Sequence, residues 1–140
     1  MPSMGAKLSA SQSTLPPAPG SRTPAVLCGE SDDHRLLLRG LLRLYRHPVI
    51  YEARTLDDLE QLTPASDPRI LILDVDGGDD RWTLELAGAL AQHSELRAVV
   101  ILPTGDPEAE RRALAAGARA VLPRPFAIQD LVRTLGRAVE

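Results

Sequence analysis

Asp74 is the residue of this chain best placed to act as a nucleophile or a metal ligand. It closes the apolar run 70–73 and is followed by Val75, Asp76 and the Gly77-Gly78 pair. An apolar run bounded by turn residues is typical of a strand buried on both faces, and open α/β sheets bind ligands at the carboxyl ends of such strands. A carboxylate there can act as a nucleophile or bind a metal ion. The alternative is that Asp74 only caps the next turn or helix.

Further polar residues follow the other predicted strands. Glu30, Ser31 and Asp32 come after the first apolar run, Thr104 after the fourth and Arg124 after the fifth. The carboxyl ends of parallel strands meet at one edge of a sheet, so we expect these side chains to converge with Asp74. Acids, a hydroxyl and a base around one crevice favour a metal ion and an anion bound together.

Alternating strands and helices must position these residues. Strands are predicted at 25–28, 49–51, 69–74, 98–102 and 120–122. Helices are predicted at 32–46, around Leu56, Leu59 and Leu62, around Trp82, Leu84, Leu86 and Leu90, at 106–116, and at the end of the chain with Ile128, Leu131, Val132, Leu135 and Val139 on one face. This alternation implies right-handed crossovers and a parallel sheet with helices on both sides, a three-layer α/β sandwich.

Composition limits the class of protein. Residues 1–23 are rich in Ser, Pro and Gly and are predicted to be a disordered extension, which leaves one domain at 24–140. Cys28 is the only cysteine, so no intramolecular disulfide forms. The net charge of −3 gives no sign of nucleic-acid binding. No run approaches the roughly 18 apolar residues of a membrane span and no signal peptide is evident, so we expect a cytoplasmic protein.

The domain at 24–140 resembles the receiver domains of bacterial two-component response regulators. Four segments carry the resemblance: 26–32 at the acidic end of the first strand, 71–74 at the third, 113–118 at the end of the fourth helix, and Arg124-Pro125-Phe126 after the fifth strand. The resemblance implies a flavodoxin-like, CheY-like fold, with a five-stranded parallel sheet in the order 2-1-3-4-5 and five helices.

The resemblance also implies a role for each matching residue. Asp74 would accept a phosphoryl group from a sensor histidine kinase or phosphotransfer protein, and the main-chain carbonyl of Asp76 would bind Mg²⁺. Arg124 stands where the family has a phosphate-binding lysine, and a cis peptide bond is expected before Pro125. Glu30 and Asp74, with Asp32, complete the expected ligands of Mg²⁺.

Several positions depart from the family pattern. Ser31 stands where the family has the carboxylate nearest to Mg²⁺, although Asp32 is close enough to replace it. In a rival alignment, residues 32–34 match the two adjacent acids that the family has after its first strand. This alignment needs two extra residues in or after the first strand. It places Leu37, Leu41 and Leu44 on the buried face of the helix.

The residues expected to couple phosphorylation to a surface change are also altered. Leu102 or Pro103 stands where the family has Thr or Ser. Thr104 could supply the missing hydroxyl group only if its loop is rearranged. Val121 replaces an aromatic residue of the fifth strand. His34 and His93 are expected to be solvated helix residues.

We therefore predict a single-domain receiver without enzymatic activity of its own. It would accept a phosphoryl group on Asp74 and signal through protein contacts with a downstream target, since no output domain follows Glu140. A homodimer through 115–140 is expected on family grounds. The alternative is a pseudo-receiver, a constitutive interaction module. A small phosphatase using Asp74 and Asp76 is a distant third.

Overall fold

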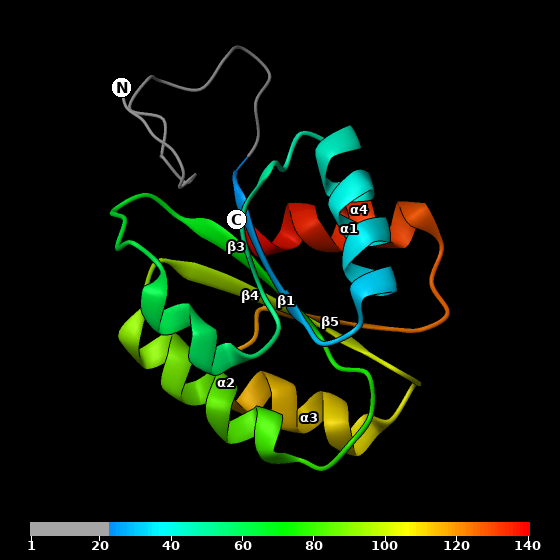
Figure 1. The fold of residues 1–140 in the computed structure, drawn as a ribbon. Coiled ribbons are helices and arrows are strands. Elements are labelled where there is room, and N and C mark those ends of the chain that lie inside the picture. Colours follow the sequence, from blue (N-terminus) through cyan, green and yellow to red (C-terminus); the bar gives the residue numbers. More distant parts are fainter. Residues whose placement is uncertain (1–22) are drawn as a thin grey trace.

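A five-stranded parallel sheet forms the centre of the protein (Figure 1). The computed structural model describes residues 23–140, so the predicted disordered extension lies, apart from Thr23, outside the described residues. The strand order is β2-β1-β3-β4-β5, which confirms the predicted topology. The strands are β1 Ala25–Gly29, β2 Val49–Ala53, β3 Arg69–Asp74, β4 Leu96–Leu102 and β5 Ala120–Pro123.

Five helices of the described region lie where the apolar patterns predict them. They are α1 Asp32–Leu44, the 3₁₀ helix η1 Leu56–Gln61, α2 Arg81–Gln92, α3 Pro107–Ala115 and α4 Ile128–Ala138. Ser31 begins α1, because its Oγ accepts a hydrogen bond of 3.1 Å from the backbone N–H of His34. Gly117 follows α3 with a φ of 112°, a left-handed conformation that glycine adopts without strain.

The helices form two layers on opposite faces of the sheet. Helices α1 and α4 cover one face, and η1, α2 and α3 cover the other (Figure 1). Successive strand residues point to opposite faces. Ile70 and Ile72 pack on the α1/α4 side, whereas Leu71 and Leu73 pack on the other. By the same alternation, Asp74 faces α1 and α4.

Helix α1 buries a different set of leucines from the rival alignment. Leu38 and Leu42 are fully buried, whereas Leu37 is 63% exposed and Leu44 is 69% exposed. The rival alignment, which needs Leu37 and Leu44 inside, is therefore wrong. Glu30 and Ser31 follow directly after β1.

The buried face of α4 is also rotated from the predicted one. Leu131 and Leu135 are buried as expected, together with Thr134 and Ala138. Ile128, Val132 and Val139 are between 37% and 48% exposed, so their assignment to the buried face is wrong. Thr134 can be buried because its hydroxyl donates a hydrogen bond of 2.7 Å to the backbone carbonyl of Asp130.

An ion pair lies at the start of β3, opposite the end that carries Asp74. Arg69 pairs with Glu95, which precedes β4, and their side chains are only 4% and 10% exposed. The central strand therefore begins at a buried cation and ends at a buried anion. Separately, none of the helices in the described part of the chain has the length and apolar character needed to span a bilayer.

Candidate functional site

Asp74 ends β3 at the centre of the sheet edge. In the sheet register it lies opposite Gly29 of β1 and Ile101 of β4. A Cβ atom built on Gly29 would lie 3.0 Å from Cβ of Asp74, so glycine at this position leaves the room that Asp74 occupies. The Asp74 side chain has no exposed surface. A buried carboxylate is costly unless it is paired and hydrogen-bonded, so its partners define the site.

Two donors hold the Asp74 carboxylate, one on each oxygen. Arg124 Nη1 lies 2.5 Å from Oδ1, and His34 Nδ1 lies 2.8 Å from Oδ2. The pairing with a carboxylate, which accepts hydrogen bonds, needs the hydrogen of the imidazole on Nδ1. The site therefore joins the first turn of α1 and the segment after β5 to the end of β3.

The expectation that His34 is a solvated helix residue is wrong. His34, Leu38 and Leu42 are spaced by four residues, so they share the face of α1 that packs on the sheet. That face brings the imidazole over the end of β3, where its side chain is only 32% exposed. The four-residue spacing is a signal in the sequence, but it does not identify His34 by itself because the other leucines of α1 also fit further helical faces. His93, at the end of α2, is also buried rather than solvated.

Arg124 occupies the predicted position. The Arg124–Pro125 peptide bond is cis, as the resemblance implies. The guanidinium carbon also lies 5.9 Å from the centre of the Phe126 ring, close enough for a cation–π contact. Phe126 thus helps to orient the guanidinium toward Asp74.

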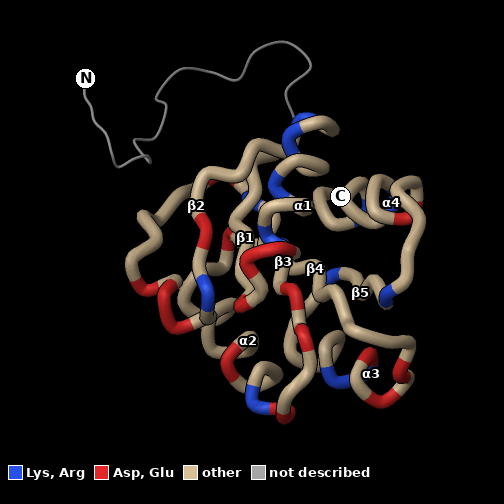
Figure 2. The backbone as a smooth tube through the Cα atoms, turned by 45° about the vertical axis from the view of Figure 1, so that its right-hand side comes forward, with Lys and Arg blue, Asp and Glu red and all other residues tan. Residues whose placement is uncertain are grey.

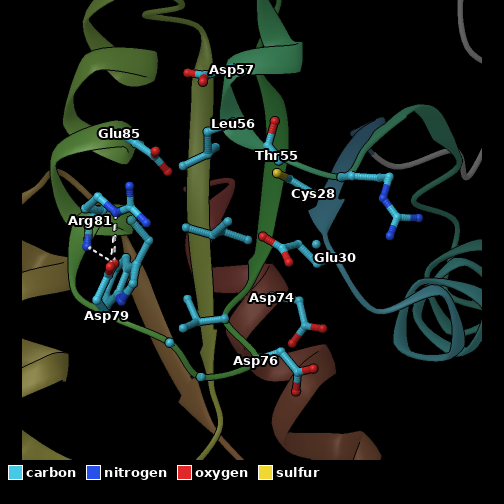
Figure 3. A pocket seen from close by; sticks show the side chains of 17 residues that line it. Cys28, Glu30, Thr55, Leu56, Asp57, Asp74, Asp76, Asp79, Arg81 and Glu85 are labelled. Atoms are coloured by element: carbon cyan, nitrogen blue, oxygen red, sulfur yellow. Dashed lines mark hydrogen bonds and ion pairs between the residues drawn. The ribbon is translucent and has the colours of Figure 1, made fainter.

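A pocket of about 500 Å³ opens beside Asp74, between the ends of β1 and β3 and the helices η1 and α2. Glu30, Asp74 and Asp76 lie along one side of it (Figure 3). Asp76, whose main-chain carbonyl is a predicted metal ligand, places its side-chain Oδ1 3.9 Å from Nδ1 of His34.

The pocket walls are mainly acidic. Its charged lining residues are Glu30, Asp57, Asp74, Asp76, Asp79, Glu85, Arg54 and Arg81. Figure 2 shows acidic backbone positions around this edge of the sheet, and basic positions along α1. Cys28 also lines the pocket, but burial, aided by nearby acidic groups, raises the pKa of its thiol to about 12. The thiol therefore stays protonated at neutral pH and is a poor nucleophile.

Among the predicted ligands of Mg²⁺, Asp32 has other partners. The Asp32 carboxylate pairs with Arg35 and lies 3.0 Å from Arg54 Nη1, and Ser31 Oγ is used to cap α1. Among the described residues, no three His, Cys, Asp or Glu side chains form a group that could hold a metal ion. Each oxygen of the Asp74 carboxylate already has one protein donor, His34 or Arg124.

The remaining predicted positions lie apart from Asp74. Thr104 is exposed in the loop after β4, and within the described region no hydrogen bond joins it to Asp74. Leu102 is buried, and Val121 packs against the core at the position expected for an aromatic switch. The structure thus brings together Asp74, Arg124 and His34, with Asp76 beside them.

Comparison with known proteins identifies the fold but no closer relative. No family model and no curated protein matches this chain. A protein named as a pilus assembly protein, cpaE, from Burkholderia thailandensis has a TM-score of 0.72 and 21% identity, covering 84% of this chain and 98% of that one. A response regulator from Thermotoga maritima has a TM-score of 0.70 and 18% identity, over 84% and 98% of the two chains.

A third solved structure, NtrX from Brucella abortus, matches over only part of its length. It has a TM-score of 0.70 and 26% identity over 83% of this chain, but only 26% of NtrX is covered. A CheY-like receiver domain protein from Methanospirillum hungatei also shares the architecture, with a TM-score of 0.65. Residues 23–140 therefore have the fold of response regulator receiver domains.

Proposed function

We propose that this chain is a receiver module of two-component signalling in which Asp74 accepts a phosphoryl group. The observation that carries the proposal is the buried Asp74 carboxylate at the end of β3, with the Arg124 guanidinium 2.5 Å from one of its oxygens. A carboxylate is a competent nucleophile toward phosphorus when a neighbouring cation offsets the charge of the transferred group. The receiver fold supports the same role.

The transfer needs only one bond exchange. An oxygen of Asp74 attacks the phosphorus of the donor, a P–O bond forms, and the bond to the leaving group breaks with its electron pair. With phosphohistidine the leaving group is imidazole, and with acetyl phosphate it is acetate. Arg124 can then turn its forked donors from the carboxylate to the phosphoryl oxygens. A donor kinase or phosphotransfer protein and a downstream protein target belong to this proposal.

Incubation of the 140-residue chain with acetyl phosphate should add one phosphoryl group to its intact mass. The adduct should be absent from Asp74→Asn and unchanged in Asp67→Asn, because Asp67 is an exposed acid before the start of β3, away from the site. Intact-mass spectrometry at short reaction times measures this directly. A lack of adduct at saturating donor, or an adduct that persists in Asp74→Asn, would contradict the proposal and favour a constitutive interaction module.

A further inference from the structure

We propose that His34 takes the place of a divalent cation beside Asp74, so that this chain binds neither Mg²⁺ nor Mn²⁺ at the carboxyl end of β3. The inference goes beyond the proposed function, since it concerns the resting site and holds whether or not Asp74 accepts a phosphoryl group. It also departs from the expectation of Mg²⁺ that the resemblance implies.

The position of the imidazole carries the inference. His34 Nδ1 lies 2.8 Å from Oδ2 of Asp74 and 3.9 Å from Oδ1 of Asp76, so it stands between the two carboxylates. A magnesium ion binds oxygen at about 2.0–2.1 Å. An ion on this side of Asp74 would meet the N–H group of His34, whose hydrogen carries partial positive charge. The donor and the cation therefore compete for the same place.

The other side of the carboxylate is closed as well. Arg124 holds Oδ1 of Asp74, and the Asp74 side chain has no exposed surface. Magnesium usually keeps several of its water ligands in proteins, and those waters need room around the ion. The pocket of about 500 Å³ beside Asp74 has room for a hydrated cation, but the Asp74 side chain has no exposed surface, so its carboxylate oxygens do not face that space while His34 and Arg124 are in place.

His34 is also fixed at two points. Its backbone N–H donates to Ser31 Oγ at the start of α1, and its side chain shares the buried face of Leu38 and Leu42. Ser31 Oγ therefore caps helix α1 rather than binding an ion. Asp32, the acid that could replace it, is held by Arg35 and Arg54. Moving the imidazole away would require a change of side-chain rotamer and the loss of its contact with Asp74.

Binding of Mn²⁺ to the full chain, followed by electron paramagnetic resonance, tests the inference. The native chain should bind Mn²⁺ at least about tenfold more weakly than His34→Ala, a difference of roughly 1.4 kcal/mol. Mg²⁺ should compete for the new site, and adding Asp74→Asn to His34→Ala should remove it. His34→Asn keeps a side-chain N–H donor and should exclude the ion as the native residue does.

Two outcomes would overturn the inference. One is a native chain that binds Mn²⁺ as tightly as His34→Ala and loses the ion in Asp74→Asn. The other is His34→Ala, folded by circular dichroism, that binds no Mn²⁺ either, since His34 would then not be the residue that excludes the ion. His34→Ser provides a second ring-free variant if the alanine variant does not fold. Neither result depends on the phosphoryl adduct, so the two proposals can fail separately.

Discussion

Truncation of Glu95 to alanine should lower the free energy of unfolding by about 3–5 kcal/mol, the usual cost of leaving one member of a buried ion pair alone. Glu95 is the partner of Arg69, and the two side chains are 10% and 4% exposed. Arg69 Nε is already buried without a hydrogen-bond partner among the described residues. Without Glu95 the guanidinium would keep its charge inside the protein. Urea unfolding followed by circular dichroism measures the change.

A double variant and a surface variant provide the controls for Glu95. Replacement of both partners, as Arg69→Met with Glu95→Leu, should recover most of the loss because no charge remains buried. Glu108→Ala should cost less than about 1 kcal/mol, since Glu108 pairs with Arg111 on the exposed surface of α3. Equal losses for Glu95→Ala and Glu108→Ala would show that burial of the Arg69 pair has no energetic consequence.

Replacement of Arg124 by methionine should destabilise the protein by about 2–3 kcal/mol and abolish the phosphoryl adduct. Methionine fills a similar volume but provides no donor, so the buried Asp74 carboxylate keeps only the hydrogen bond from His34. Arg124 is 24% exposed, which lets water replace part of the lost contact and keeps the cost below that of Glu95→Ala. The measurements are urea unfolding and intact mass after acetyl phosphate treatment.

A double-mutant cycle separates the pairing of Arg124 from its other contacts. In an Asp74→Asn background no carboxylate remains, so Arg124→Met should cost at least about 1 kcal/mol less than in the native background. The remaining cost then reports the contact between Arg124 and Phe126. An identical cost in both backgrounds would mean that Arg124 stabilises the protein without acting through Asp74.

The order of strands and helices could be predicted from the sequence because strands buried on both faces are continuous apolar runs. The end of β3 at Asp74 could be predicted from the acidic, glycine-rich turn that follows it. The position of Arg124 at the same edge of the sheet could be predicted because Arg124 follows the fifth apolar run. The start of β4 was less clear, since the structure begins this strand at Leu96, two residues before the predicted one. Arg97 interrupts the apolar pattern there although it lies within the strand.

The contact between His34 and Asp74 could not be read from the sequence with the same ease. Leucines at 36, 37, 38, 41, 42 and 44 fit more than one helical face. Local periodicity does not choose among these faces, because the choice depends on where the sheet lies relative to α1. The pairing of Asp32 with Arg54 likewise depends on the tertiary structure, since Arg54 follows β2 and is far from Asp32 in the sequence.

The full burial of Asp74 has a kinetic consequence. If Asp74 accepts a phosphoryl group as proposed, we expect it to react only in conformations in which His34 or Arg124 has withdrawn, because its side chain has no exposed surface. The rate of phosphoryl transfer would then be proportional to the fraction of molecules in which His34 or Arg124 has withdrawn. At high donor concentration, the rate would level off at the rate of this withdrawal. Under the proposed function, we expect the response to depend on how easily His34 or Arg124 withdraws as well as on the intrinsic nucleophilicity of Asp74.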